Sequence, residues 1–162
     1  MLENKREFDI RLYHKCDNKS KLAAIELMKH RGYELDGDIE KEHYKNYDLK
    51  FKHPITNEIL YIENEYRGAY RKIRDVYDTV HIPIRKKVSK CDYYFVWGCD
   101  YNEVGIIKMS DILKFGDNPV NVLCIEAMKL YDSEAYCEDF IDVPKGLVLF
   151  LKKNKKGIWK KY

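Results

Sequence analysis

The sequence predicts an α/β fold of the α+β kind, with a central mixed β-sheet flanked by helices. Two observations predict this class. Apolar residues recur at helical spacing over 22–31, and the later segments 47–52, 58–65 and 91–97 show the period-two or continuous apolar patterns of strands. With 162 residues and 45% hydrophobic content, the chain can bury one core. We therefore expect a single domain over residues 1–162.

The first expected element is a helix. It begins near Ser20, an acceptable N-cap, and continues to Arg31, after which Gly32 can end it in the left-handed conformation. The segment up to Leu35 then leads into the sheet. The apolar stripe of this helix consists of Leu22, Ala23, Ala24, Ile25, Leu27 and Met28.

A hairpin follows, with strands at 47–52 and 58–65. Both strands alternate with period two, and the segment between them contains Pro54 and Asn57, which favour a tight connection. With a four-residue loop, the numbers of opposed residues add up to 111. One face of the hairpin is then apolar and the other charged, whereas a shift by one residue would mix them.

Three carboxylates gather on the charged face in this register. Asp48 lies opposite Glu63, and Glu65 lies two residues further along the strand. Opposed side chains have Cβ atoms about 5 Å apart, so their like charges need compensation. Protonation, a basic neighbour such as Lys50, or a hard cation such as Mg²⁺ could supply it. A cation accounts for all three acids, and an ordinary exposed strand face is the alternative.

Several elements are expected after the hairpin. Residues 69–80 have helical spacing, and Pro83 marks a break before the basic residues 85–87. Residues 91–97 and 104–109 are typical of central strands. The remaining expected segments are a brief helix capped by Ser110 and Asp111, and apolar segments of unassigned type at 119–127 and 147–151.

The hairpin motif resembles that of the PD-(D/E)xK nuclease superfamily, whose fold is called restriction-endonuclease-like. Asp48 matches the first acid of the motif, and Glu63 in Glu63-Asn64-Glu65 matches the second. The resemblance spans roughly residues 20–110. It implies a restriction-endonuclease-like core in which these two acids bind catalytic Mg²⁺ or Mn²⁺, and the hairpin register adds Glu65 as a further candidate ligand.

One position departs from the motif. Glu65 stands where the family has a Lys that assists the attacking water. The general-base role is therefore open, and Lys50 and Lys86 are the candidates for a relocated basic group. Glu26 is the candidate for the extra carboxylate that many family members supply from the first helix.

Basic residues are concentrated in two segments. Residues 67–90 hold eight Lys or Arg against two acids, and the tail at 152–162 holds six Lys and no acid. Such segregation can present a positive face to a nucleic acid, here most simply DNA, and the alternative is an ordinary solvated surface with Trp159 packing the tail onto the domain. The expected contact residues are Arg67, Arg71, Arg85, Lys86, Lys87 and Lys160.

Composition also argues against several classes of protein. Five cysteines without a CxxC pair do not suggest a disulfide framework or a zinc site. The first 15 residues lack a signal-peptide core, and no run of 18 apolar residues occurs. We expect a cytoplasmic protein with no membrane partner, and the host cytoplasm if the Lys-, Tyr-, Asn- and Ile-rich composition reflects a viral source. The oligomeric state stays open, a homodimer included.

The expected function is Mg²⁺-dependent hydrolysis of phosphodiester bonds in nucleic acid. The first alternative is a catalytically inactive nucleic-acid-binding or assembly protein with a nuclease fold, which the absence of Lys at position 65 favours. The second is a metal-dependent enzyme that acts on a small phosphorylated molecule in a closed pocket.

Overall fold

The computed structural model describes residues 10–39, 47–67, 78–84, 86, 90–116, 120–123 and 137–162. Its helices and strands are, in chain order, α1 (Ile10–His30), β1 (Glu34–Leu35), β2 (Leu49–Lys52), β3 (Ile59–Tyr66), β4 (Thr79–Pro83), β5 (Tyr93–Trp97), β6 (Glu103–Lys108), α3 (Met109–Phe115), β7 (Val120–Leu123), β8 (Cys137–Pro144), the short 3₁₀ helix η2 (Lys145–Leu147), β9 (Val148–Lys153) and β10 (Trp159–Lys161).

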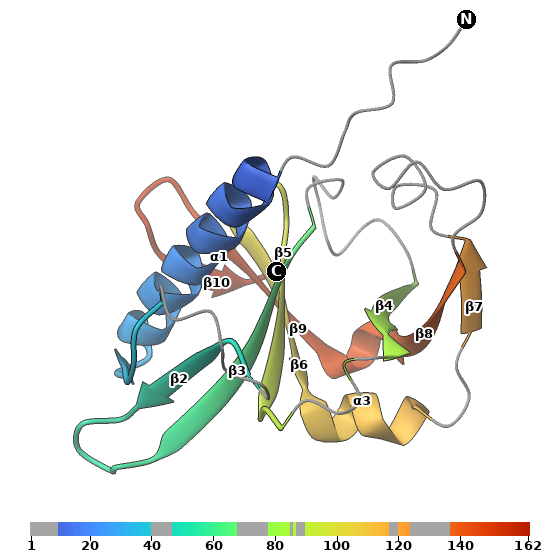
Figure 1. The fold of residues 1–162 in the computed structure, drawn as a ribbon. Coiled ribbons are helices and arrows are strands. Elements are labelled where there is room, and N and C mark those ends of the chain that lie inside the picture. The colour runs from blue at the N-terminus through green and yellow to red at the C-terminus, as the bar shows by residue number, and fades with distance from the viewer. Residues whose placement is uncertain are drawn as a thin grey trace, which may run out of the picture.

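The strands form two sheets. The larger has the order β1-β2-β3-β5-β6-β9-β10, and the smaller has the order β4-β8-β7 (Figure 1). β3 and β5 are parallel, whereas the other neighbouring strands are antiparallel. The predicted mixed sheet in an α+β fold is thus confirmed. Neither described α-helix is long and apolar enough to cross a membrane.

Each face of the large sheet carries its own core. α1 covers one face, where Leu27 packs with Phe51 and Ile62 of the hairpin strands. The small sheet and α3 cover the other face, where Ile82 and Ile141 pack with Tyr94. Figure 1 shows α1 and the β4-β8-β7 sheet on opposite sides of the large sheet. Side chains that alternate along β3 and β5 therefore enter different cores.

The hairpin register is the predicted one. Leu49 pairs with Ile62 and Phe51 with Leu60, so opposed residue numbers add up to 111. The His53 N–H donates to the Glu58 carbonyl at 2.8 Å and closes the loop. Period-two alternation therefore placed both hairpin strands correctly relative to each other.

The first helix begins ten residues before its predicted start. Ser20 lies inside α1 and is fully buried, and its hydroxyl donates to the Asp17 carbonyl at 2.8 Å rather than capping the helix. Asp17 also pairs with Lys21 at 2.8 Å, an i,i+4 ion pair that supports the preceding turns. The predicted end is confirmed, because Gly32 has φ +86°.

The predicted tail at 152–162 is wrong. β9 continues to Lys153, and β10 returns alongside it as the edge strand of the large sheet. Trp159 packs edge-to-face on the buried Trp97, with ring centroids 5.7 Å apart. Tyr162 donates to the Glu103 carboxylate at 2.8 Å. These aromatic contacts anchor a segment whose lysines indicated a solvated tail, so the packing role for Trp159 is the correct one.

Two further predictions are corrected around the small sheet and α3. Most of the predicted 69–80 helix lies outside the described residues, but its last two residues belong to β4. Val80 and Ile82 alternate into the core there, which is strand periodicity. α3 begins at Met109, with Lys108 at the N-cap position, so Ser110 is inside the first turn and makes no cap.

The unassigned apolar segments are strands. Residues 120–123 form β7, and the rest of 119–127 lies outside the described residues. The segment at 147–151 contains the start of β9, which lies between β6 and the edge strand β10 in the large sheet.

Candidate functional site

Asp48 and Glu63 lie close enough at the end of the hairpin for the charge of Glu63 to act on Asp48. The Asp48 N–H donates to the Ile62 carbonyl at 2.9 Å, a bond that is offset by one residue from the register of β2 and β3. Glu63 is 6% exposed. Burial and the charge of Glu63 raise the pKa of Asp48 from 3.8 to about 6. The two carboxylates therefore share a poorly hydrated place where two negative charges are costly.

Lys86 brings a positive charge to this pair. It lies in the segment after β4, and its Nζ donates to Glu63 Oε1. Burial lowers the pKa of Lys86, but the charge of Glu63, its hydrogen bond and the charge of Asp48 outweigh that effect and raise it. Lys86 is therefore charged at neutral pH and is a cation rather than a proton acceptor. The structure thus joins a residue of the predicted basic segment to the predicted acid.

Asp48 has a second partner on β3. Its Oδ2 accepts a hydrogen bond from the Asn64 N–H at 2.7 Å, which lowers the pKa of Asp48. Lys21 of α1 acts in the same direction through its charge. These contacts moderate the rise that burial and Glu63 cause.

Glu65 is held differently from the other two acids. Its Oε1 accepts a hydrogen bond from Arg67 Nε at 3.0 Å, and Arg67 also donates to the His81 carbonyl on β4. Its Oε2 is buried and has no hydrogen-bond partner among the described residues. One carboxylate oxygen is therefore tied to the small sheet and the other is left without a donor.

Two other predicted residues are engaged elsewhere. Lys50 pairs with Asp36 at 2.7 Å, next to β1. Glu26 accepts from Lys153 at 2.9 Å, which joins α1 to β9. Neither contact belongs to the Asp48–Glu63 pair.

The predicted nucleic-acid contacts are scattered or not described. Lys160 is exposed on the edge strand β10. The Arg67 side chain is 12% exposed in its ion pair with Glu65, so it is mostly withdrawn from the surface. Arg71, Arg85 and Lys87 lie outside the described residues.

Sequence reasoning missed the polar residues behind the hairpin. Asn64 is on the same face of β3 as Ile62, and it is 5% exposed. Its side chain bonds Ser20 on α1 and Trp97 on β5. An amide at a position that the alternation assigns to the apolar face is the signal that could have revealed this network.

Asp48 and Glu63 are the carboxylates that a divalent cation could use as ligands. No group of three or more His, Cys, Asp or Glu side chains in the described part of the chain is arranged to hold a metal ion. Mg²⁺, however, is usually bound by one or two carboxylates, with water and substrate oxygens completing its shell. Asp48 and Glu63 are such a pair, and the buried Glu65 Oε2 without a donor lies on the same face of β3.

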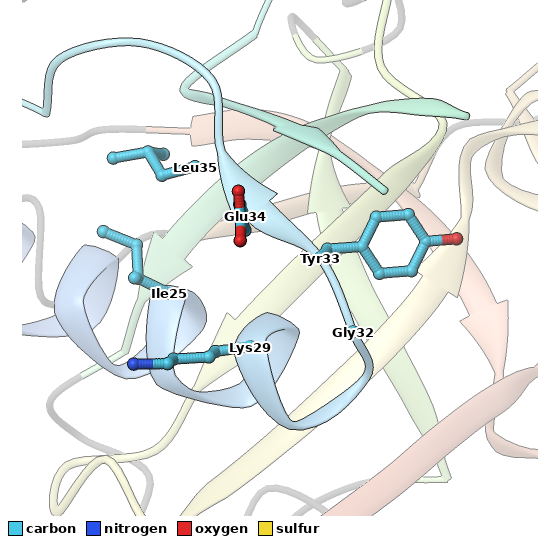
Figure 2. Close-up of a pocket in the computed structure, with 6 residues that line it drawn as sticks. All are labelled: Ile25, Lys29, Gly32, Tyr33, Glu34 and Leu35. Carbon is cyan, nitrogen blue, oxygen red and sulfur yellow. The ribbon is translucent and has the colours of Figure 1, made fainter. Parts of the chain in front are cut away.

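A surface hollow lies elsewhere, between the end of α1 and β1. It has a volume of about 390 Å³ and is lined by Ile25, Lys29, Gly32, Tyr33, Glu34 and Leu35. Figure 2 shows Lys29 and Ile25 projecting from the helix beside the strand that carries Glu34 and Leu35. It contains none of the predicted site residues.

Comparisons of the chain with protein-family models, curated proteins and solved structures found no match.

Proposed function

We propose that this protein hydrolyses phosphodiester bonds of nucleic acid, with DNA as the substrate and Mg²⁺ or Mn²⁺ as the cofactor. The observation that carries the proposal is the convergence of Asp48, Glu63 and Lys86. They come from three separate segments and meet in a half-buried place with two negative charges and one positive charge. Catalytic groups commonly have such perturbed surroundings.

A restriction-endonuclease-like core is part of the proposal. A leading helix, α1, packs on β3, the hairpin strand that carries Glu63. Asp48, next to β2, lies close enough for the charge of Glu63 to raise its pKa, and this proximity of the two motif acids supports the assignment.

Asp48 and Glu63 would hold the cation, and the buried Glu65 Oε2 is a further carboxylate oxygen on the same face of β3. When bound, the cation would lower the pKa of a water molecule and neutralise charge on the phosphate. Asp48 must be ionised to act as a ligand, so its raised pKa makes metal binding weaken as the pH falls below about 6.

Lys86 has an electrostatic role in this proposal. Its raised pKa keeps a proton on Nζ, so it cannot deprotonate the attacking water. It instead orients Glu63 and places positive charge beside the position of the phosphate, where it would stabilise the charge of the transition state. Of the two Lys candidates, Lys86 contacts Glu63 at the site, whereas Lys50 pairs with Asp36.

A specific observation favours the alternative function of nucleic-acid binding or assembly without chemistry. The position of the motif Lys holds Glu65, and Arg67 binds that carboxylate. Because Arg67 also donates to the His81 carbonyl, this ion pair is part of a structural link between β3 and β4. The alternative predicts DNA binding that does not depend on Asp48 or on metal.

Cleavage assays test the proposal. Wild type, Asp48→Asn and Lys86→Met are incubated with plasmid, single-stranded and branched DNA in Mg²⁺, Mn²⁺ or EDTA, and the products are resolved on gels. We expect cleavage by wild type that EDTA abolishes. Asp48→Asn should lose more than about 100-fold in rate, and Lys86→Met about 100-fold.

Matched controls are an acid and a lysine that lie outside the site. Asp36→Asn and Lys114→Met change the same residue types at exposed or distant ion pairs and should cleave like wild type. DNA binding by wild type without cleavage in either metal would support the inactive alternative and overturn the proposal.

A further inference from the structure

Three buried polar side chains meet behind the hairpin. Asn64 Nδ2 donates to Ser20 Oγ at 2.8 Å, and Trp97 Nε1 donates to Asn64 Oδ1 at 2.7 Å. Ser20 and Trp97 are fully buried and Asn64 is 5% exposed. The network therefore ties α1, β3 and β5 together inside a core that is otherwise apolar.

Both ends of the Asn64 amide are satisfied. Ser20 Oγ accepts from Asn64 and donates to the Asp17 carbonyl, so the chain of hydrogen bonds has a single direction. A buried polar group costs free energy unless all of its bonds form, so such a network specifies one arrangement of its members. The rotamer and the strand position of Asn64 are fixed by partners on two other elements.

The backbone N–H of Asn64 contacts the candidate site through Asp48. Asn64 lies two residues beyond Ile62, the last residue of β3 that pairs with β2. Its N–H donates to Asp48 Oδ2 at 2.7 Å. The same residue thus contacts the buried network through its side chain and the candidate ligand through its backbone.

We propose that Asn64, locked by Ser20 and Trp97, is a positioning residue that holds the Asp48 carboxylate toward Glu63 for cation binding. This inference rests on the proposed function, since it assigns a role behind the same site. Partners that orient a metal ligand commonly matter for affinity, and their loss typically weakens binding by about 10- to 100-fold.

Mn²⁺ affinity, followed by electron paramagnetic resonance of the free ion, tests the inference without relying on catalysis. The variants are Asn64→Ala, Ser20→Ala and Trp97→Phe, and the last two each delete one hydrogen bond and keep most of the packing. We expect Mn²⁺ binding to weaken about 10-fold in each. Ser20→Ala added to Asn64→Ala should cause little further loss, because both act through Asn64.

Val104→Ala is the matched control for stability. Val104 is fully buried in the same core but lies on β6, outside the network. It should lower the free energy of unfolding and leave Mn²⁺ affinity unchanged. If the network variants bind Mn²⁺ like Val104→Ala, Asn64 has only a structural role and the inference is overturned, whereas absence of Mn²⁺ binding by wild type would overturn the proposed metal site as well.

Discussion

At the scale of single residues, Asp48 is the most informative side chain. Burial and Glu63 favour its protonated form, whereas the Asn64 N–H, Lys86 and Lys21 favour the carboxylate. The first two effects are the larger ones, so the pKa rises to about 6. A group with this balance is sensitive both to pH and to an added cation.

The raised pKa predicts a specific pH dependence of stability. The folded state holds the Asp48 proton up to a pH of about 6, whereas the ordinary value is 3.8. As the pH rises through this interval the unfolded chain ionises first, so Asp48 lowers the free energy of unfolding, by about 2 to 3 kcal/mol once the pH exceeds 6. Urea unfolding of wild type and Asp48→Asn between pH 4 and pH 7 measures the free energy of unfolding. As the pH rises, Asp48→Asn should become increasingly more stable than wild type.

Asp36→Asn is the control, because the pKa of Asp36 is lowered whereas that of Asp48 is raised. The hydrogen bond and charge of Lys50 lower the pKa of Asp36, so this exposed carboxylate gives no advantage to its Asn variant at neutral pH. A constant difference between wild type and Asp48→Asn across the whole interval would contradict the raised pKa.

Single residues also show what the sequence could and could not predict about the site. The hairpin alternation predicted the β2–β3 register, and Asp48 and Glu63 interact at the end of the paired region. The Lys86–Glu63 ion pair joins residues 23 positions apart, and among several basic residues at 85–90 no local pattern distinguishes this one. The Ser20–Asn64 bond joins positions 44 apart, and it depends on how α1 crosses the sheet.

At the scale of elements, the sequence predicted an element correctly where its apolar side chains recur with a clear period. The hairpin and the turn at Gly32 follow from alternation and from the need for a left-handed residue. The start of α1 and the strand β10 were not predicted, because charged residues are frequent in both segments. A contact to a distant element anchors β10, where Trp159 packs on Trp97.

The end of α1 provides a prediction for the helix–strand junction. Gly32 has φ +86°, and a Cβ at this position would lie 3.1 Å from His53 Nε2. Gly32→Ala should therefore lower the free energy of unfolding by about 1 to 2 kcal/mol through backbone strain and crowding. Equilibrium urea denaturation measures the change.

Gly146→Ala is the matched control for this substitution. Gly146 lies outside the left-handed region, and a Cβ there would meet nothing within 4 Å. Its Ala variant should stay within about 0.5 kcal/mol of wild type. Equal effects of the two substitutions would show that Gly32 is not required by its conformation.

At the scale of the whole molecule, the site forms where the two sheets approach each other. β3 carries Glu63 and Glu65, and the segment around β4 supplies Lys86 and the carbonyl of His81 that Arg67 binds. The opposite face of the same strand holds Asn64 against α1. One strand thus connects the candidate chemistry on one side with the core that supports it on the other.

This arrangement explains why the fold class was easier to predict than the assembly of the site. The mixed sheet follows from the strand patterns, whereas the core between the two sheets joins residues such as Tyr94 of β5 and Ile141 of β8, which are 47 positions apart. The small β4-β8-β7 sheet was not anticipated as a separate sheet, although it brings Lys86 to the hairpin.

Anomalous X-ray scattering from crystals of the full chain soaked in Mn²⁺ tests most directly our claim that Asp48 and Glu63 form a cation site. We predict an anomalous peak between the two carboxylates in wild type that is absent from Asp48→Asn. Mn²⁺ density elsewhere, or none at the hairpin while Lys86 stays on Glu63, would contradict the claim.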